Sequence, residues 1–427
     1  MHGEIIAIGD ELVSGKVLNT TASFAANKLF AAGYQVTRIT SIGDDPDDIE
    51  ECLLAAIKRS KYVIITGGLG PTTDDITNEV TSKALGRPQV LNEMILEKIR
   101  RAKKRFANSA FLREKLAWLP EGAEVLNPEG RAAGYLLIHQ DIPLFFLPGV
   151  PKELEDHLIN RVIPMLSRFF SGKISIRQQT FKVFGLSETE INKLFEKLES
   201  SQDGLSIGYY PNFPEVNVTA TVKGRNSGKV AEIFHMACNT IEQLLGRYVV
   251  AVNEETLEEV VGRLLLEKGG ILSLSESCTG GLVSHRVTSI PGSSGWFEGG
   301  VITYSNKSKE DFLGVSPKTL SLHGAVSSQA AMEMANGVKR LAGTGYSLAI
   351  TGIAGPSGGT TQKPVGTVYI ALSTPERTVA ERFQFIGTRH MIQILAAETA
   401  LDLLRLHLNY GTYFPCNRPA QFTAQDT

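Results

Sequence analysis

The chain has 427 residues, which at roughly 150 residues per domain is enough for about three domains that each bury a core. Hydrophobic residues make up 42% and charged residues 21%, and the mean hydropathy is -0.02, so the composition excludes a disordered chain. The net charge is -2, from 43 basic and 45 acidic residues, so no overall field steers the protein towards nucleic acid or an anionic membrane.

The cysteines and the first residues bear on the cellular compartment. Cys52, Cys238, Cys278 and Cys416 stand far apart and form no CxxC pair, which argues against a disulfide framework or a thiolate metal site. The N-terminus has no basic segment of the kind that opens a secretory signal, and no apolar run approaches the roughly 20 residues that span a bilayer. We therefore expect a cytoplasmic protein with no membrane association.

Residues 1–170 alternate between strand and helix patterns. Strands are expected over 4–8, 34–42 and 62–66, and Asp45 can cap the helix that precedes the third strand. This alternation predicts βαβαβ units and a mostly parallel sheet. Ligands of such sheets bind at the carboxyl ends of the strands, which directs attention to the glycine-rich loop after the third strand.

The rest of the chain divides into two further parts and a tail. Residues 171–252 contain short elements and an alternating stretch, which predict a small α+β domain with an antiparallel sheet. Residues 253–415 return to strand and helix alternation, and 416–427 are expected to be disordered. The predicted fold class is α/β, with two α/β domains of mostly parallel sheets joined by a small α+β domain.

The first candidate site is the run TGGLGPTTDD at 66–75. Its glycines allow a backbone to approach a phosphate closely, and the helix that follows adds its positive N-terminal end. Asp74 and Asp75 could hold a hard divalent cation that bridges to the phosphates. The structural alternative is that the glycines only form a tight turn and the aspartates only cap a helix.

This run, together with GDELVSG at 9–15, NPEG at 127–130 and LPGVPKE at 147–153, resembles the molybdopterin-binding-type domain at the front of CinA-family proteins. The resemblance implies metal-dependent hydrolysis of ADP-ribose to AMP and ribose 5-phosphate, and relatives with this fold bind molybdopterin. It departs from the family at 128–135, where Arg131 adds a bulky cation, and at Asn19-Thr20. The implied residues for a divalent cation of the Mg or Co class are Asp10, Asp74 and Asp75; for substrate they are Gly67, Gly68, Gly70, Thr72 and Asn127.

The second candidate site is the serine- and glycine-rich run at 275–281, which ends a predicted strand and opens a helix. A serine needs an activating base to attack an acyl carbon, and a lysine of depressed pKa can take the place of histidine in that role, which makes Lys309 a candidate. Cys278 is better interpreted as a small buried residue than as a catalytic thiol. Serine-rich turns such as the one at 291–297 are structural in most proteins.

The motifs ESCTGG, GSSGWFEGGVITYSNKSK, HGAVS and TGIAGPSGG together resemble the C-terminal CinA domain, a nicotinamide-nucleotide amidase. The resemblance implies that the carboxamide of nicotinamide mononucleotide is hydrolysed to nicotinate mononucleotide and ammonia, without a cofactor. It gives Ser294 as nucleophile beside Tyr304, with Lys309 or Ser277 relaying the proton and loop amides holding the oxyanion. Arg389 is expected to hold the phosphate; the other implied substrate-binding residues are Thr279, Gly280, Thr351, Gly352 and Gly355.

The middle part resembles the KH-like linker domain of full-length CinA proteins. A KH domain clamps nucleic acid with a GXXG loop, and Gly185-Leu186-Ser187-Glu188 lacks the second glycine. We expect a spacer or dimerisation element in a homodimer, with nicotinamide mononucleotide and ADP-ribose as the partners. Two alternatives to a bifunctional enzyme remain open: a pterin-binding module without turnover, and a non-catalytic competence or damage-response partner.

The helix predicted over 256–268 bears on whether the domains separate. Its apolar stripe faces its own sheet and not obviously the domain before it. We therefore expect the back domain to fold and act without residues 1–250.

Overall fold

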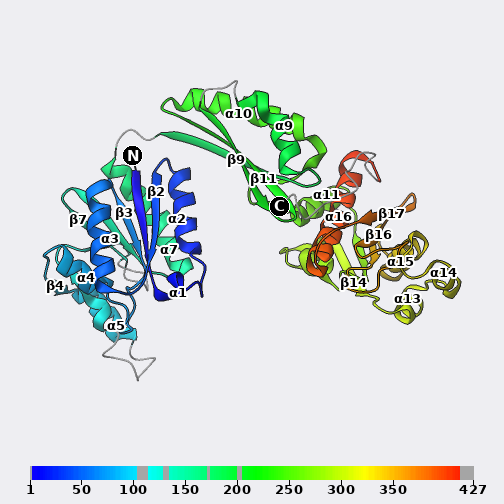
Figure 1. The fold of residues 1–427 in the computed structure, drawn as a ribbon, viewed down its shortest axis with the longest axis horizontal. Coiled ribbons are helices and arrows are strands. Elements are labelled where there is room, and N and C mark those ends of the chain that lie inside the picture. The colour runs from blue at the N-terminus through cyan, green and yellow to red at the C-terminus, as the bar shows by residue number, and fades with distance from the viewer. Residues whose placement is uncertain (1, 103–113, 128–133, 171–173, 200–203, 414–427) are drawn as a thin grey trace. The chain divides into compact units, whose positions relative to one another are not determined.

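The computed structural model describes residues 2–102, 114–127, 134–170, 174–199 and 204–413. The chain forms two compact units, of which unit 1 comprises Met1–Arg177 with Lys223–Val230 and unit 2 comprises Gln178–Val222 with Ala231–Thr427. Figure 1 shows the helices and strands of both units. Among the helices of the described residues, none is long and apolar enough to cross a bilayer.

Unit 1 is built on a six-stranded sheet with the order β2-β1-β3-β8-β7-β6. The strands from β2 to β8 run parallel, and β7 and β6 add antiparallel strands at one edge. The bounds are β1 (His2–Ile8), β2 (Gln35–Ile42), β3 (Val63–Thr66), β6 (Glu124–Val125), β7 (Tyr135–His139) and β8 (Ile142–Leu147), with a separate pair β4 (Gln89–Leu91) and β5 (Trp118–Pro120). The expected parallel sheet is confirmed.

Helices cover both faces of this sheet. Alternate strand residues enter different cores, so Ile6 and Ile65 pack on one side while Ile5 and Ile64 pack on the other. Asp45 caps α3 as its sequence predicts, because its carboxylate accepts the N–H groups of two following residues at 2.9 and 3.1 Å. The helices are α1 (Asp10–Val13), α2 (Thr20–Ala31), α3 (Pro46–Arg59), α4 (Thr77–Ala84), α5 (Glu93–Ala102), α7 (Pro151–His157) and α8 (Ile163–Phe169), with short turns η2 (Lys115–Ala117) and η3 (Leu158–Val162).

The KH-like part opens unit 2 with a four-stranded sheet of order β10-β11-β9-β12. Both β10 with β11 and β12 with β9 pair antiparallel. Ser187 caps α9, since it exchanges hydrogen bonds with Glu190 at 2.8 to 3.3 Å, so the segment at which a KH loop would clamp a backbone is a helix cap. The elements are β9 (Ser175–Val183), α9 (Glu188–Glu199), β10 (Leu205–Asn212), β11 (Glu215–Gly224), α10 (Ser227–Leu245), η4 (Gly246–Tyr248) and β12 (Val249–Val252).

The back part of unit 2 has a five-stranded sheet of order β14-β13-β15-β16-β17, in which β14, β13 and β15 are parallel and β16 and β17 are antiparallel. Its strands are β13 (Leu272–Glu276), β14 (Phe297–Ile302), β15 (Tyr346–Gly352), β16 (Thr367–Ser373) and β17 (Thr378–Gln384). The sequence patterns did not anticipate β17. The helices are α11 (Leu257–Glu267), α12 (Leu282–Thr288), α13 (Asn306–Leu313), α14 (Pro317–His323), α15 (Ser328–Ala342) and α16 (Arg389–Tyr410), with the turn η5 (Ser293–Gly295).

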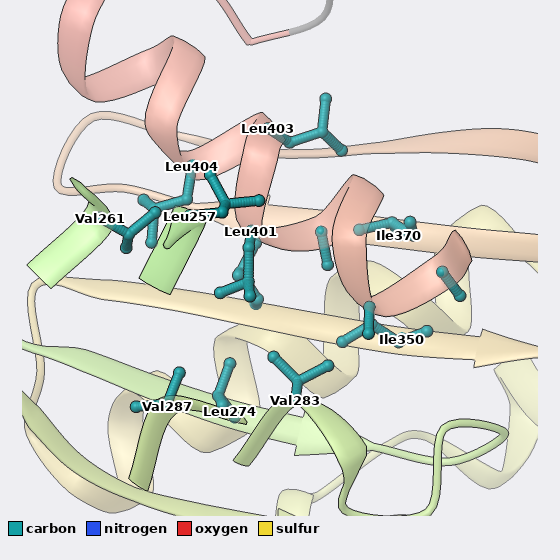
Figure 2. Close-up of a cluster of buried hydrophobic side chains, with 14 of the residues drawn as sticks. Leu257, Val261, Leu274, Val283, Val287, Ile350, Ile370, Leu401, Leu403 and Leu404 are labelled. Carbon is teal, nitrogen blue, oxygen red and sulfur yellow. The ribbon is translucent and has the colours of Figure 1, made fainter. Parts of the chain in front are cut away.

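One buried core joins α11, α12, α16 and the sheet. Figure 2 shows Leu401 and Leu404 of α16 beside Leu257 and Val261 of α11. The same cluster contains residues of the KH-like part, namely Phe184, Val250 and Ala251, with Phe213 packed against it. The apolar stripe of α11 faces its own sheet, as expected, and the KH-like part also supplies apolar side chains to this core, which its sequence did not indicate.

Candidate active site

A cavity of about 340 Å³ lies at the carboxyl ends of β13 and β15 in unit 2. Many of its lining residues carry predicted roles: Ser277, Tyr304, Lys309, Thr351, Gly352, Gly355 and Arg389. Sequence reasoning gave no role to the lining residues Ala325, Val326, Ile353, Ala354, Ser357 and Gly358. These residues belong to the motifs HGAVS and TGIAGPSGG, which could have indicated them. The two segments lie at the ends of α14 and β15 and line the cavity.

Lys309 and Ser277 form the reactive pair of this cavity. Lys309 lies on α13 with only 1% of its surface exposed, and its Nζ is 3.0 Å from Ser277 Oγ. The same nitrogen lies 2.6 Å from the carbonyl oxygen of Thr303 and 3.4 Å from that of Tyr304. Burial lowers the pKa of Lys309 to about 8, because an ammonium ion loses its hydration there. Near pH 7 most of the lysine is still protonated, but its neutral share is far larger than that of a lysine in water.

A neutral amine suits these contacts. In the charged form Nζ donates to Ser277 Oγ and to the carbonyls of Thr303 and Tyr304; the neutral amine keeps two N–H groups for the carbonyls and has one lone pair, which can accept the hydroxyl proton of Ser277. This contact would allow Lys309 to act as a base towards the hydroxyl of Ser277.

Glu276 fixes the backbone on which Ser277 stands. It is fully buried, and its carboxylate accepts hydrogen bonds from the N–H groups of Gly281, Val283 and Ser284 at 3.0, 3.2 and 2.8 Å and from Ser284 Oγ at 2.7 Å. The negative charge also suits the N-terminal end of α12. The amides of Gly281, Val283 and Ser284 at the start of α12 therefore point at Glu276 and not at a ligand.

Arg389 is the cation of the cavity. It opens α16, and its guanidinium donates to the carbonyl oxygen of Gly355 at 2.7 Å and to the hydroxyl of Tyr304 at 3.1 Å. Both partners are uncharged, so these contacts orient the positive charge without neutralising it. A guanidinium at the N-terminal end of a long helix is suited to an anion such as a phosphate.

Cys278 lines the cavity but is unsuited to attack. Burial raises the pKa of its thiol to about 12, so the thiolate is scarce at neutral pH. The side chain of Gln393 on α16 donates to the carbonyl oxygen of Cys278 at 2.8 Å and holds the loop against the helix. Thr279 and Gly280 do not line the cavity, and Thr351 uses its hydroxyl to bind the carbonyl of Ala325 at 2.8 Å.

The structure places Ser294 away from this cavity. It lies exposed in the turn η5, before β14 begins, whereas the cavity follows the ends of β13 and β15. Parallel pairing aligns Leu272 with Phe297 and Glu276 with Ile302, so about 16 Å of strand separates Ser294 from the reactive pair. Ser294 is therefore not positioned to attack a substrate held in this cavity. Trp296, two residues after Ser294, packs against Gly262 of α11. A Cβ added to Gly262 would come within 2.6 Å of the indole ring of Trp296.

The glycine-rich loop of unit 1 is tightly fixed. Gly67 and Gly68 have φ values of +99° and +64°, and a Cβ on Gly67 would lie 2.1 Å from the carbonyl oxygen of Ile8. Asp75 braces the loop, because its carboxylate accepts the N–H groups of Gly70 and Thr72, each at 2.8 Å, and the hydroxyl of Thr72. Asp75 thus braces the turn itself; it does not cap the helix that follows, because the N-cap of α4 is Ile76.

Acidic groups surround this loop. Asp10 and Asp44 exchange backbone-to-carboxylate hydrogen bonds at 3.0 and 3.1 Å. Burial raises the pKa of Asp44, and the nearby charges of Asp10, Asp74 and Glu11 raise it further. Hydrogen bonding from Thr72 lowers the pKa of the exposed Asp74.

The expected metal set does not fit a ready-made cation site. Within the described ranges, no three histidine, cysteine or carboxylate side chains are arranged to hold a metal ion. The physical reason is that the oxygens of Asp75 are already bonded inside the loop. Asn127 lies just after β6, and Arg131 lies outside the described residues.

Comparison with known proteins gives the family. Residues 4–168 match the model of a probable molybdopterin binding domain, 178–251 that of the damage-inducible protein CinA KH domain, and 254–408 that of the CinA C-terminal domain. A CinA-like protein of Desulfotalea psychrophila is 44% identical over 410 residues, covering 96% of this chain and 99% of the relative. The chain belongs to the CinA family, as its motifs predicted.

Two further relatives carry names that refer to competence. A putative competence-damage inducible protein of Caldanaerobacter subterraneus is 38% identical over 96% of this chain and 98% of its own. The crystal structure of the competence damage-inducible protein A from Klebsiella pneumoniae is 33% identical, covers 36% of this chain and 96% of that one, and has a TM-score of 0.35.

Proposed function

We propose that the back part of unit 2 is a serine amidohydrolase that deamidates nicotinamide mononucleotide. The observation that carries the proposal is the buried contact of 3.0 Å between Lys309 Nζ and Ser277 Oγ inside a cavity that also holds Arg389. A nucleophile bonded to a base of lowered pKa is the arrangement that serine hydrolases need.

The reaction divides into two displacements. Ser277 Oγ attacks the carboxamide carbon while Lys309 Nζ takes the hydroxyl proton. The lysine then gives this proton to the departing amide nitrogen, the C–N bond breaks, and ammonia leaves an ester on Ser277. Water attacks the ester, Lys309 takes its proton and returns it to Ser277 Oγ, and nicotinate mononucleotide leaves. The cycle needs neither metal nor redox cofactor.

Arg389 supplies the binding contact for the phosphate. Its guanidinium is held by two neutral oxygen atoms, which keeps it oriented and charged. An anion bound there would satisfy both the guanidinium and the N-terminal end of α16. A substrate with a single phosphate and a carboxamide at its other end fits these two features of the site.

The test is ammonia release from nicotinamide mononucleotide by the full chain. Ser277→Ala should abolish it, and Ser294→Ala should not. Absence of turnover in the unsubstituted chain under any buffer condition would instead favour a non-catalytic competence or damage-response partner.

A second candidate function, hydrolysis of ADP-ribose to AMP and ribose 5-phosphate, is proposed for unit 1. It is favoured by the fixed glycine loop at the carboxyl end of β3 and by the acidic groups beside it, which raise the pKa of Asp44. Because no cation site is ready-made there, a divalent ion of the Mg or Co class would have to arrive with the diphosphate. Binding of a pterin without turnover of ADP-ribose would favour the alternative of a cofactor-binding module.

A further inference from the structure

An ionic cluster lies inside unit 2, where the KH-like part meets α11, α12 and α16. Arg286 of α12 is at its centre, with Nη2 2.6 Å from Glu398 Oε2 on α16 and Nε bonded to Glu258 on α11. Glu398 and Glu258 are only 1% and 7% exposed. Glu215, on β11 of the KH-like part, adds a third carboxyl group, and Lys182 on β9 faces it.

The second carboxylate oxygen of Glu398 is not used by the ion pair with Arg286. Oε1 is buried and accepts no hydrogen bond from a conventional donor in the described part of the chain. The carboxyl group of Glu215 lies within hydrogen-bonding reach of the carboxyl group of Glu398. Two ionised carboxylates are acceptors only, so a hydrogen bond between them requires one of them to carry a proton.

The charges of the cluster lead to the same requirement. Three carboxyl groups, Glu215, Glu258 and Glu398, face two cations, Lys182 and Arg286. One added proton brings the five groups to neutrality, which matters because buried net charge is costly. Burial, opposed by Arg286 but reinforced by Glu215, raises the pKa of Glu398 to about 7, and burial also raises the pKa of Glu215.

We propose that Glu215 and Glu398 share one proton, and that this proton fastens the KH-like part to α12 and α16. This inference is independent of the proposed function. A carboxyl pair whose pKa is raised in the folded state stabilises the junction fully below the ordinary pKa of glutamate. The stabilisation is lost as the pH rises through the raised value, so the junction should loosen between pH 6 and pH 8.

Hydrogen exchange of the full chain measures this loosening. Peptides from 205–222 and 389–410 are followed at pH 6 and pH 8, with exchange times corrected for the intrinsic effect of pH. For a pKa of about 7, release of one proton should raise the opening constant about tenfold over this interval.

Two variants isolate the proton. The amide introduced by Glu398→Gln can accept from Arg286 and donate permanently to Glu215, and the amide introduced by Glu215→Gln can donate to Glu398. Each substitution should remove the difference between pH 6 and pH 8. Glu232→Gln, which removes a charge from an exposed position on α10, should keep the full difference.

The outcomes separate clearly. Equal protection of the unsubstituted chain at the two pH values would overturn the proposal, and so would a full difference in Glu215→Gln. Should Glu398→Gln fail to fold, Glu215→Gln alone decides, because Glu215 is less buried and its side chain is not part of the ion pairs with Arg286.

Discussion

The Nζ atom of Lys309 and the Oγ atom of Ser277 lie 3.0 Å apart, although 32 positions separate the two residues in the chain. The contact exists because Ser277 directly follows β13 and Lys309 lies on the helix that follows the neighbouring parallel strand β14. The contact contributes to catalysis directly only if Ser277, and not Ser294, is the nucleophile.

Ser277→Ala should lower the rate of deamidation by at least about a thousandfold, as loss of a serine nucleophile does elsewhere. Ser294→Ala should keep the rate of deamidation within about twofold of the unsubstituted chain, because that side chain lies at the end of the sheet remote from the cavity. Ammonia release measures both, and circular dichroism confirms that each variant folds. A reversed ranking would return the nucleophile to Ser294. Cys278→Ser should retain substantial activity.

The pH dependence of deamidation should report Lys309. Because its pKa is lowered to about 8, the lysine is protonated and inactive as a base at lower pH, and the rate should rise with pH and level off above about 8. Below that value the rate should fall about tenfold per pH unit. A pH–rate profile of the full chain checks this. Lys309→Met should abolish the deamidation whose rate depends on pH. A profile flat from pH 6 to pH 9 would show that another group is the base.

Arg389→Gln should weaken binding of the phosphate without disabling the reactive pair. We expect KM for nicotinamide mononucleotide to rise about tenfold or more, as for loss of a charged hydrogen bond. The matched comparison is nicotinamide riboside, which lacks the phosphate and should react equally well with both proteins. An equal loss on the two substrates would mean that Arg389 acts through Tyr304 or Gly355.

Metal removal should distinguish the two units. A chelator should leave deamidation unchanged, since the residues around Ser277 are a lysine, hydroxyls and an arginine. Turnover of ADP-ribose by unit 1 should stop and return on addition of a divalent cation. Asp75→Asn should additionally lower the thermal stability of unit 1, because that side chain braces the loop, whereas Asp74→Asn should not. Deamidation that is lost with chelator would contradict the metal-free mechanism.

Removal of the front of the chain should give different results at two boundaries. A chain beginning at Gln178 retains Phe184, Val250 and Ala251 and should keep full deamidase activity. A chain beginning near Asn253 loses these side chains and exposes the core around Leu257, so it should unfold at lower temperature. Calorimetry of both proteins measures the difference. Equal melting temperatures would restore the view that the back domain is self-sufficient.

The sequence predicted much of this architecture because its signals are local. Asp45 before Pro46 marks the start of α3, and the alternation of strand and helix gives the two α/β sheets. The position of Ser294 away from the cavity could not be predicted, because a glycine-serine turn has the same local pattern at either end of a strand. Only the parallel register of β13 with β14 shows that its turn lies at the end remote from the cavity.

The roles of Glu276 and Asp75 depended on contacts that composition does not reveal. An acidic residue directly before Ser277, with Thr-Gly-Gly at 279–281, was a usable signal for a carboxylate that caps the next helix. Pairing of Glu215 with Glu398 had no signal, because it joins a strand of the KH-like part to a helix far along the chain.

The order of synthesis follows from the position of α16. This helix comes after every other described element, yet it carries Arg389, Gln393, Glu398 and Arg405, the last of which donates to the carbonyl oxygen of Arg247 at 2.6 Å. A ribosome that has made residues 1–388 has therefore produced a sheet without its central helix and a cavity without its cation. Any premature stop before Arg389 should yield a chain that exposes the face of Leu257 and Val261 and depends on chaperones until it is degraded.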